Sequence, residues 1–182
     1  MNVIIVHGTS PHANADKFWY RPLAESLEAV GIQCDVPELP ELDREPLEST
    51  LAQIQGLGLQ MGPETVLIGH SAGSNIVLAL LEQARTPVLS AYLVAGYCSD
   101  NGMRHSALKD SYDWDVIRSN AKDFIMLNSF NDPFHCDEKQ GKALFEHLGG
   151  TLILRNDGHF TKKRQPLLST LLSQQLTSLS AF

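Results

Sequence analysis

The chain alternates between short apolar runs and longer segments in which apolar residues recur every three or four positions. Short runs rich in β-branched residues are typical of buried strands, and the longer spacing is typical of amphipathic helices. The pattern predicts strands at Val3–Val6, Ile32–Val36, Thr65–Ile68, Ser90–Ala95, Phe124–Leu127 and Thr151–Leu154. It predicts helices at Lys17–Val30, Leu47–Leu59, Ser74–Leu81, Tyr112–Ser119, Asp137–Leu148 and Gln165–Leu179.

Regular alternation of strands and helices favours βαβ units and a parallel sheet. With 182 residues and no internal repeat or linker, the chain is expected to form a single domain over residues 1–182. Segment 37–46 contains three prolines and four acidic residues, so it is expected to be a surface loop. In such a sheet the strand Thr65–Ile68 should lie near the middle, with all the strand carboxyl ends at one edge.

Composition excludes some classes of function. The formal net charge of -7 argues against a nucleic-acid partner, which requires a basic face, and the one basic run, Lys162–Arg164, is expected to start a helix in solvent. Three widely spaced cysteines do not form a disulfide framework, which favours a reducing compartment. The first apolar run is too short for a signal peptide or a membrane span. A cytoplasmic protein is therefore expected.

The middle of the chain contains a G-x-S-x-G pattern, from Gly69 to Gly73, with Ser71 at its centre. An apolar strand precedes the pattern and an apolar helix follows it. In a nucleophile elbow the serine lies on a strained strand-to-helix turn, and the flanking glycines let the strand and helix pass close together. Ser71 is therefore the candidate nucleophile.

A serine nucleophile needs a base, and the base needs an orienting carboxylate. His159 follows the last strand and precedes the last helix, which fits the chain order Ser, Asp/Glu, His. Asp132 follows the fifth strand in a sharp turn and is the candidate acid. Asp100, after the fourth strand, is a rival for that role, whereas Asp157 is expected to shape the loop that carries His159.

Oxyanion stabilisation requires hydrogen-bond donors that already point at the developing charge. The backbone amide of Ala72, at the start of the elbow helix, is one candidate. The second is expected from the turn after the first strand, at Thr9, although Gly8 can equally serve only to permit that turn.

Other histidines and cysteines fit simpler roles. A metal site is not expected, because there is no H-E-x-x-H pattern and His7 and His12 lie in a loop that contains glycine and proline. Cys98 and Cys136 are expected to be structural thiols. His70 is expected to brace the elbow, and the remaining histidines, at the surface or in packing, are His12, His105, His135 and His147. The candidates for lining a substrate pocket are His7, Trp19, Phe134 and Phe160.

Several motifs together resemble one known family. They are VIIVHG at the start, Trp19-Tyr20, LIGHSAG, Ser99-Asp100, Asp113 to Ile117, Asn131 to Phe134, and Gly158 to Phe160. The chain resembles the small serine hydrolases related to retinoblastoma-binding protein 9 and the bacterial YdeN proteins, a branch of the α/β-hydrolases. The resemblance implies a three-layer fold with a six-stranded parallel sheet and a minimal lid. It also implies that Ser71, Asp132 and His159 form the triad.

The function expected from these residues is hydrolysis of small-molecule carboxylic esters or amides through an acyl-serine intermediate, with no cofactor. Two alternatives stay open. One is a non-catalytic, partner-binding protein, which the family name and the Thr9-Ser10-Pro11 turn suggest, since relatives often carry a glycine-rich turn there. The other is a thioesterase or acyltransferase that uses the same triad. A protein partner has no support in the sequence: the segment Phe134 to Glu138 only partly matches a retinoblastoma-binding peptide.

Overall fold

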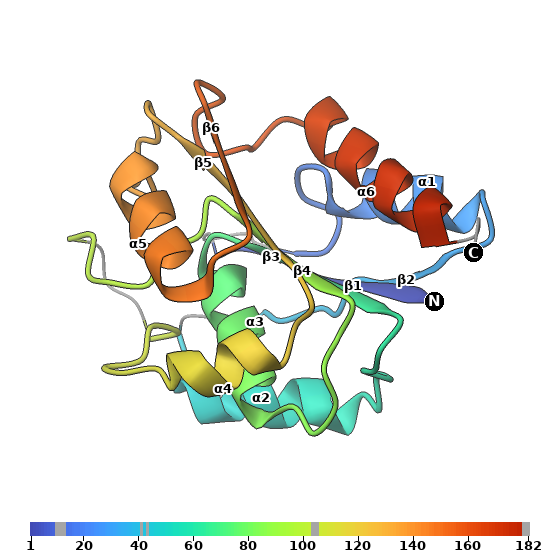
Figure 1. The fold of residues 1–182 in the computed structure, drawn as a ribbon, viewed down its shortest axis with the longest axis horizontal. Coiled ribbons are helices and arrows are strands. Elements are labelled where there is room, and N and C mark those ends of the chain that lie inside the picture. Colours follow the sequence, from blue (N-terminus) through green and yellow to red (C-terminus); the bar gives the residue numbers. More distant parts are fainter. Residues whose placement is uncertain (10–13, 41, 43, 103–105, 180–182) are drawn as a thin grey trace.

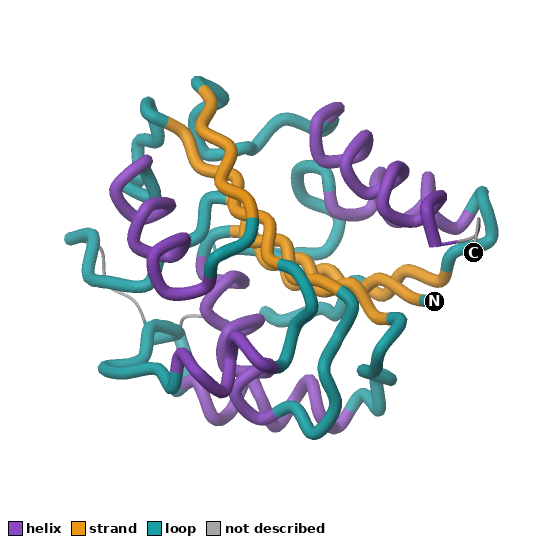
Figure 2. Tube along the Cα trace, in the orientation of Figure 1, coloured by secondary structure: helices purple, strands orange, loops and turns teal. Residues whose placement is uncertain are grey.

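Six strands form one parallel sheet with helices on both of its faces (Figures 1 and 2). The structure is a computed structural model, and it describes residues 1–9, 14–40, 42, 44–102 and 106–179. The strands are β1 (Asn2–Val6), β2 (Gln33–Asp35), β3 (Thr65–His70), β4 (Ser90–Val94), β5 (Phe124–Ser129) and β6 (Thr151–Arg155). The helices are α1 (Tyr20–Glu28), α2 (Leu47–Gly56), α3 (Ala72–Gln83), α4 (Trp114–Ser119), α5 (Glu138–Leu148) and α6 (Pro166–Leu179).

The strand order is β2-β1-β3-β4-β5-β6, and every neighbouring pair is parallel. The predicted six-stranded α/β architecture is confirmed, with β3 between β1 and β4. Gly69 pairs with Val6 on one side, and His70 pairs with Val94 on the other. Because all strands run the same way, the loops that follow β1, β3, β4, β5 and β6 meet at one edge of the sheet.

Alternation along the strands divides the core between the two faces of the sheet. In β1, Ile4 and Val6 pack under α2, α3, α4 and α5, whereas Val3 and Ile5 pack under α1 and α6. Figure 1 shows the same two layers, with α1 and α6 together on one side of the sheet. Helix α3 is buried along almost its whole length, which agrees with its nearly continuous apolar sequence.

Helix α1 is shorter than its sequence pattern predicts. Lys17–Val30 was the expected span, but Phe18 has φ +58°, a left-handed conformation that an α-helix cannot contain. At the other end Gly31 has φ +82°, and Val30 lies beyond the last turn with 72% of its surface exposed. The predicted end of this helix at Val30 is therefore wrong, and the helix ends at Glu28.

The segment 37–46 is not simply a surface loop. Among its described residues, Leu39 and Leu42 are buried against α2 and α3 in the larger core cluster. The backbone amide of Leu39 also donates to Nε2 of His7, 3.0 Å away. The prolines and acidic residues correctly indicate a loop, but the two leucines attach it to the core.

Three further expectations concern compartment and surface. All three cysteines are free thiols. In the described part of the chain, no helix has both the length and the apolar character to cross a membrane. His12 and His105, together with Ser10 and Pro11 of the first turn, lie outside the described residues.

Candidate active site

Ser71 lies on the bend between β3 and α3, where its backbone has φ +54° and ψ -125°. A non-glycine residue in this region is strained, and such strain persists only where the surrounding structure enforces it. The Ser71 amide donates to the carbonyl oxygen of Val94 in β4, 2.9 Å away, which ties the bend to the sheet. The geometry is that of a nucleophile elbow.

The two glycines of the motif have different contacts. A Cβ on Gly69 would lie 2.6 Å from the carbonyl oxygen of Gly73, so this glycine lets the first turn of α3 pass over β3. A Cβ on Gly73 would lie 2.3 Å from the carbonyl oxygen of Val6, so this glycine lets α3 approach the end of β1. Backbone atoms cannot move aside easily, and both positions therefore require glycine.

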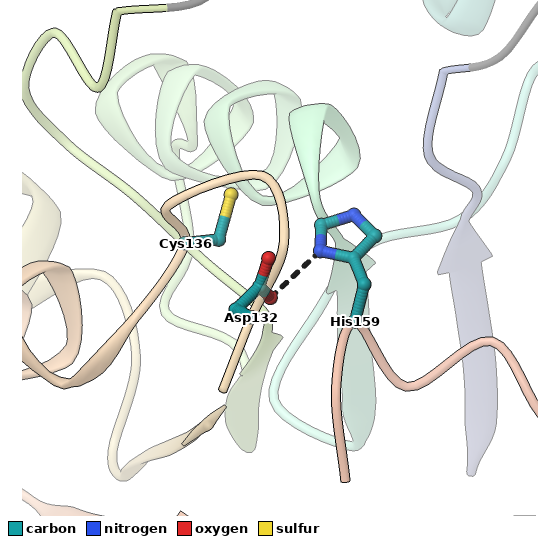
Figure 3. A group of neighbouring side chains, drawn as sticks. All are labelled: Asp132, Cys136 and His159. Carbon is teal, nitrogen blue, oxygen red and sulfur yellow. Dashed lines mark hydrogen bonds and ion pairs between the residues drawn. The ribbon is translucent and has the colours of Figure 1, made fainter. Parts of the chain in front are cut away.

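His159 and Asp132 are joined by a hydrogen bond of 2.8 Å between Nδ1 and Oδ2 (Figure 3). A carboxylate can only accept, so Nδ1 carries the proton and Nε2 of the neutral ring is left as a base. The other carboxylate oxygen accepts the backbone amide of Phe134 at 2.8 Å. The Asp132 side chain has 0% relative exposure and that of His159 has 9%. Asp132 thus fixes both the tautomer and the direction of the His159 ring.

Ser71 and His159 are not joined in this way. Among the residues that the structure describes, no hydrogen bond joins Ser71 Oγ to the His159 ring. The elbow and the loop that carries His159 are close, because the ring centroid of His70, next to Ser71, lies 5.0 Å from that of His159. Catalytic hydrogen bonds are often long before substrate binds.

His70 connects three loops through a chain of hydrogen bonds. Its Nε2 donates to the carbonyl oxygen of His159 at 2.9 Å, and its Nδ1 accepts from the hydroxyl of Tyr20 at 2.5 Å. The same hydroxyl accepts the backbone amide of Gly8 at 3.1 Å. Burial lowers the pKa of His70 to about 3, and the neighbouring His159 adds to the effect. A neutral ring suits this role, since one nitrogen must donate and the other must accept.

His70 was expected to brace the elbow, and its hydrogen bonds tie the elbow to α1 and also hold the backbone of the loop that carries His159. Tyr20 was noted only as part of a Trp-Tyr pair, and its hydroxyl is a member of the chain that sequence reasoning missed. The only local feature of the sequence that pointed to Tyr20 was its place beside Trp19, at the start of α1.

Of the candidate oxyanion donors, Ala72 is the first residue of α3, where the backbone amide has no partner within the helix. Thr9 follows Gly8 in the turn after β1 and is partly exposed. Gly8 itself cannot serve, because the Tyr20 hydroxyl already accepts its amide hydrogen. A Cβ on Gly8 would lie 3.1 Å from that of Ser71, so the turn packs directly on the elbow.

The four pocket candidates divide by burial. Phe134 is 44% exposed, and its ring meets the His159 ring edge-on at 4.7 Å. His7, Trp19 and Phe160 are all almost completely buried. The indole of Trp19 donates to the carbonyl oxygen of Phe160 at 2.9 Å, and a 250 Å³ cavity bordered by Phe160 has none of the triad candidates in its lining. These three side chains therefore support the site from within, and Phe134 alone faces solvent beside it.

His7 is held in the interior by two hydrogen bonds. Its Nδ1 donates to the carbonyl oxygen of Gly8 at 2.8 Å, while its Nε2 accepts from Leu39. Burial lowers the pKa of His7, so the ring stays neutral. It is a structural link between the first turn and the loop before α2.

The rival carboxylates have other contacts. Asp100 is exposed and accepts the amide of Gly102 at 2.8 Å. Asp157 pairs with Arg155 at 3.0 Å, which agrees with its expected part in shaping the loop. His135 and His147 are exposed, and His147 stacks on Trp114 with a centroid distance of 4.2 Å.

Two further buried polar side chains hold the loops of this edge, and no sequence pattern signals either role. Gln140 of α5 accepts the amides of Cys98 and Ser99 at 3.1 and 3.3 Å. Asn128 of β5 donates to the carbonyl oxygens of Gly96 and Cys136 at 2.9 and 3.0 Å. The loop after β4 and the turn that carries Asp132 are thereby fixed to the same strand and helix.

Cys136 lies beside the acid and the base (Figure 3). Burial raises the pKa of its thiol, and the Asp132 carboxylate raises it further. The thiol is therefore protonated in the protein as it stands, as expected for an inert buried cysteine.

Comparison with known proteins shows the family and the fold. Residues 3–165 match the family model described as "Serine hydrolase". The Bacillus subtilis protein named "Putative hydrolase YdeN" is 27% identical over 168 residues, which cover 86% of this chain and 87% of that protein.

Solved structures share the fold. The crystal structure of the ydeN gene product from B. subtilis has a TM-score of 0.87 at 24% identity, covering 97% of this chain and 98% of that one. Serine hydrolase CCSP0084 from Cycloclasticus zankles has a TM-score of 0.72 at 14% identity, with 100% and 90% covered. Mouse alpha/beta hydrolase domain-containing protein 10 has a TM-score of 0.73 at 12% identity, with 98% and 90% covered. The resemblance drawn from the sequence motifs is confirmed, and the chain belongs to the serine hydrolase family, with the fold of the α/β-hydrolases.

Proposed function

We propose that this hydrolase cleaves small carboxylic esters or amides through an acyl intermediate on Ser71. The observation that carries the proposal is the 2.8 Å hydrogen bond from His159 Nδ1 to the buried Asp132 carboxylate, at the edge of the sheet where a serine lies on a strained elbow. A histidine bound in this way has its basic nitrogen free for the serine proton.

The reaction would proceed in two halves. Nε2 of His159 takes the proton of Ser71 Oγ as the oxygen attacks the substrate carbonyl, and the same nitrogen then protonates the leaving group. A water molecule, activated by His159, hydrolyses the acyl-serine. Asp132 stabilises the positive charge that the ring carries in each half, while the amides of Ala72 and Thr9 would bind the oxyanion. No step calls for a metal or an organic cofactor.

A fluorophosphonate probe tests the nucleophile directly, because it reacts with activated serines. Labelling is expected for the unmodified protein and for Ser49→Ala, an exposed serine in α2. Labelling should be lost in Ser71→Ala and strongly reduced in His159→Ala. Equal labelling of the unmodified protein and Ser71→Ala would reject the mechanism.

A second function is favoured by one observation, the lack of a hydrogen bond between Ser71 Oγ and His159. A chain that kept the fold but lost turnover would act as a partner-binding protein. Short p-nitrophenyl esters separate the two functions, since Ser71-dependent turnover of any of them contradicts a purely binding role. The same assay with thioesters, or with amines and alcohols as acyl acceptors, distinguishes an esterase from a thioesterase or acyltransferase.

A further inference from the structure

Three side chains with metal-binding atoms meet at the edge of the sheet, on the loops that follow β5 and β6. Asp132, Cys136 and His159 each offer one ligand atom, and these atoms all lie within 4.8 Å of one another. Figure 3 shows the Cys136 sulfur and the His159 ring on either side of the Asp132 carboxylate. Two of the ligands are four residues apart on one turn, and the third comes from the neighbouring loop.

The donor set selects the kind of metal. Thiolate, imidazole and carboxylate are the ligands of tetrahedral Zn²⁺, whereas Mg²⁺ and Ca²⁺ prefer oxygen alone. Zinc bonds of about 2.0–2.3 Å at tetrahedral angles put ligand atoms about 3.3–3.6 Å apart. Since the observed atoms lie within 4.8 Å of one another, no pair has to approach by more than about 1.5 Å. Water would complete the tetrahedron.

The Cys136 sulfur gives up only weak hydrogen bonds when it binds a metal. Its contacts are long: Asn101 Nδ2 donates to it at 3.6 Å, and its own hydrogen points to the carbonyl oxygen of Phe134, 3.8 Å away. Charge also favours a divalent cation, because a buried carboxylate and a thiolate together balance two positive charges. Access is available from the side of His159, which is partly exposed beside Phe134.

We propose that Asp132, Cys136 and His159 form an inhibitory Zn²⁺ site that turns the hydrolase off, an inference that rests on the proposed function. Bonds form from zinc to Cys136 Sγ, His159 Nδ1 and one Asp132 oxygen. The thiol proton leaves to solvent, so one proton is released for each zinc bound. The Nδ1 proton of His159 has to leave that nitrogen, and it reappears on Nε2.

Inhibition follows from the change of tautomer. In the metal-free protein, Asp132 holds the proton on Nδ1 and Nε2 is the free base. Zinc on Nδ1 reverses this arrangement, because the neutral ring then carries its proton on Nε2 and cannot accept one from Ser71. Removal of zinc by a chelator restores the original tautomer. Zinc therefore inhibits the hydrolase by taking the place on Nδ1 of the proton that Asp132 normally holds there.

Zinc binding is measured first without reference to activity. Calorimetric titration of the full chain with Zn²⁺, in buffers of different ionisation enthalpy, gives the stoichiometry and the number of protons released. We expect one zinc and one proton for the unmodified protein and for the control Cys98→Ser, which alters a free thiol outside the cluster. Cys136→Ser should bind more than about 100-fold more weakly, since losing even an outer-shell partner of a metal costs about 10–100-fold.

A second measurement links binding to Ser71. Fluorophosphonate labelling, expressed relative to each variant's zinc-free rate, should fall over the same Zn²⁺ range in the unmodified protein and Cys98→Ser, and recover with chelator. Cys136→Ser should resist zinc. Equal affinity in Cys136→Ser, no binding by the unmodified protein, or binding without loss of labelling would each overturn the inhibitory site. Absence of labelling even without zinc would instead overturn the proposed function, and calorimetry would still decide whether the metal binds.

Discussion

Replacing Tyr20 by phenylalanine removes one oxygen atom and breaks two buried hydrogen bonds. The hydroxyl accepts from the amide of Gly8 and donates to Nδ1 of His70, and all three residues are buried. After the substitution the Gly8 amide and the His70 nitrogen both lose their partners. The change therefore leaves an unpaired donor and an unpaired acceptor in the interior.

The size of the effect follows from these two groups. An unsatisfied buried polar group costs about 1–3 kcal/mol, so the pair would cost about 2–6 kcal/mol if the costs added. Neighbouring sites share relaxation and are not additive, and we expect a loss of about 2–4 kcal/mol from the free energy of unfolding. Urea denaturation followed by circular dichroism measures this loss.

Tyr92→Phe is the matched control. Tyr92 is also buried, and its hydroxyl donates to Gln175 Oε1 at 3.0 Å. That oxygen keeps a second hydrogen bond, from Ser90 at 2.9 Å, so no acceptor is left without a partner. Tyr92→Phe should thus cost only about 0.5–1.5 kcal/mol. Equal losses for the two variants would refute the reasoning, because they would show that the links to Gly8 and His70 contribute nothing.

Three other changes test separate parts of the site. Gly73→Ala should destabilise the fold by about 3 kcal/mol or more, since its Cβ would lie 2.3 Å from a backbone oxygen; urea denaturation measures it. Asp132→Asn should lower the rate of ester hydrolysis by about 10³–10⁴-fold, because an amide favours the wrong tautomer of His159; steady-state kinetics measure it. Burial holds the folded pKa of His70 at about 3, below its ordinary 6.5, so the unfolded chain binds more protons between these values. Stability should therefore fall as the pH falls through this window, by about 1.4 kcal/mol per pH unit from His70, which urea denaturation over a pH series measures.

Each of these has a control. Gly56→Ala, at the end of α2, meets no atom within 4 Å and should be neutral or slightly stabilising, so equal losses at Gly56 and Gly73 would contradict the packing argument. Asp100→Asn changes the exposed rival carboxylate, and a loss of rate as large as that of Asp132→Asn would contradict the assignment of the acid. In His70→Gln the slope of the free energy of unfolding against pH should decrease by about 1.4 kcal/mol per pH unit, the contribution of one proton. An unchanged slope would show that His70 is not its source.

Much of the fold follows from local pattern. Short apolar runs predicted the positions of the strands, and the alternation of strands with helices predicted that the strands are parallel. The errors lie where distant contacts decide the backbone. Phe18 leaves the helical region next to Trp19, whose indole reaches the carbonyl oxygen of Phe160, 141 residues away. Leu39 is buried in a loop of polar composition because it packs against α2 and α3, and its amide also donates to His7.

The candidate site also has a part that local motifs predict and a part that depends on contacts between distant residues. Ser71, Asp132 and His159 could be selected because each follows a strand within a short recognisable motif, and the structure adds the hydrogen bond between the last two. Their catalytic roles stay predictions. The link from Tyr20 through His70 to the His159 carbonyl joins residues 50 and 89 positions apart, and no local pattern encodes it. For the same reason the burial of three of the four pocket candidates could not be read from the chain.

The hydrogen bonds of Tyr20 and His70 have a consequence for engineering. Loops at this edge of the sheet are the natural targets for altering substrate preference, yet the first turn and the loop of His159 share a support in α1 and the elbow. Variant libraries that randomise either loop should therefore keep both Tyr20 and His70 unchanged. A loop grafted from a relative that lacks this pair would have evolved without these hydrogen bonds, so it is not expected to keep its conformation here.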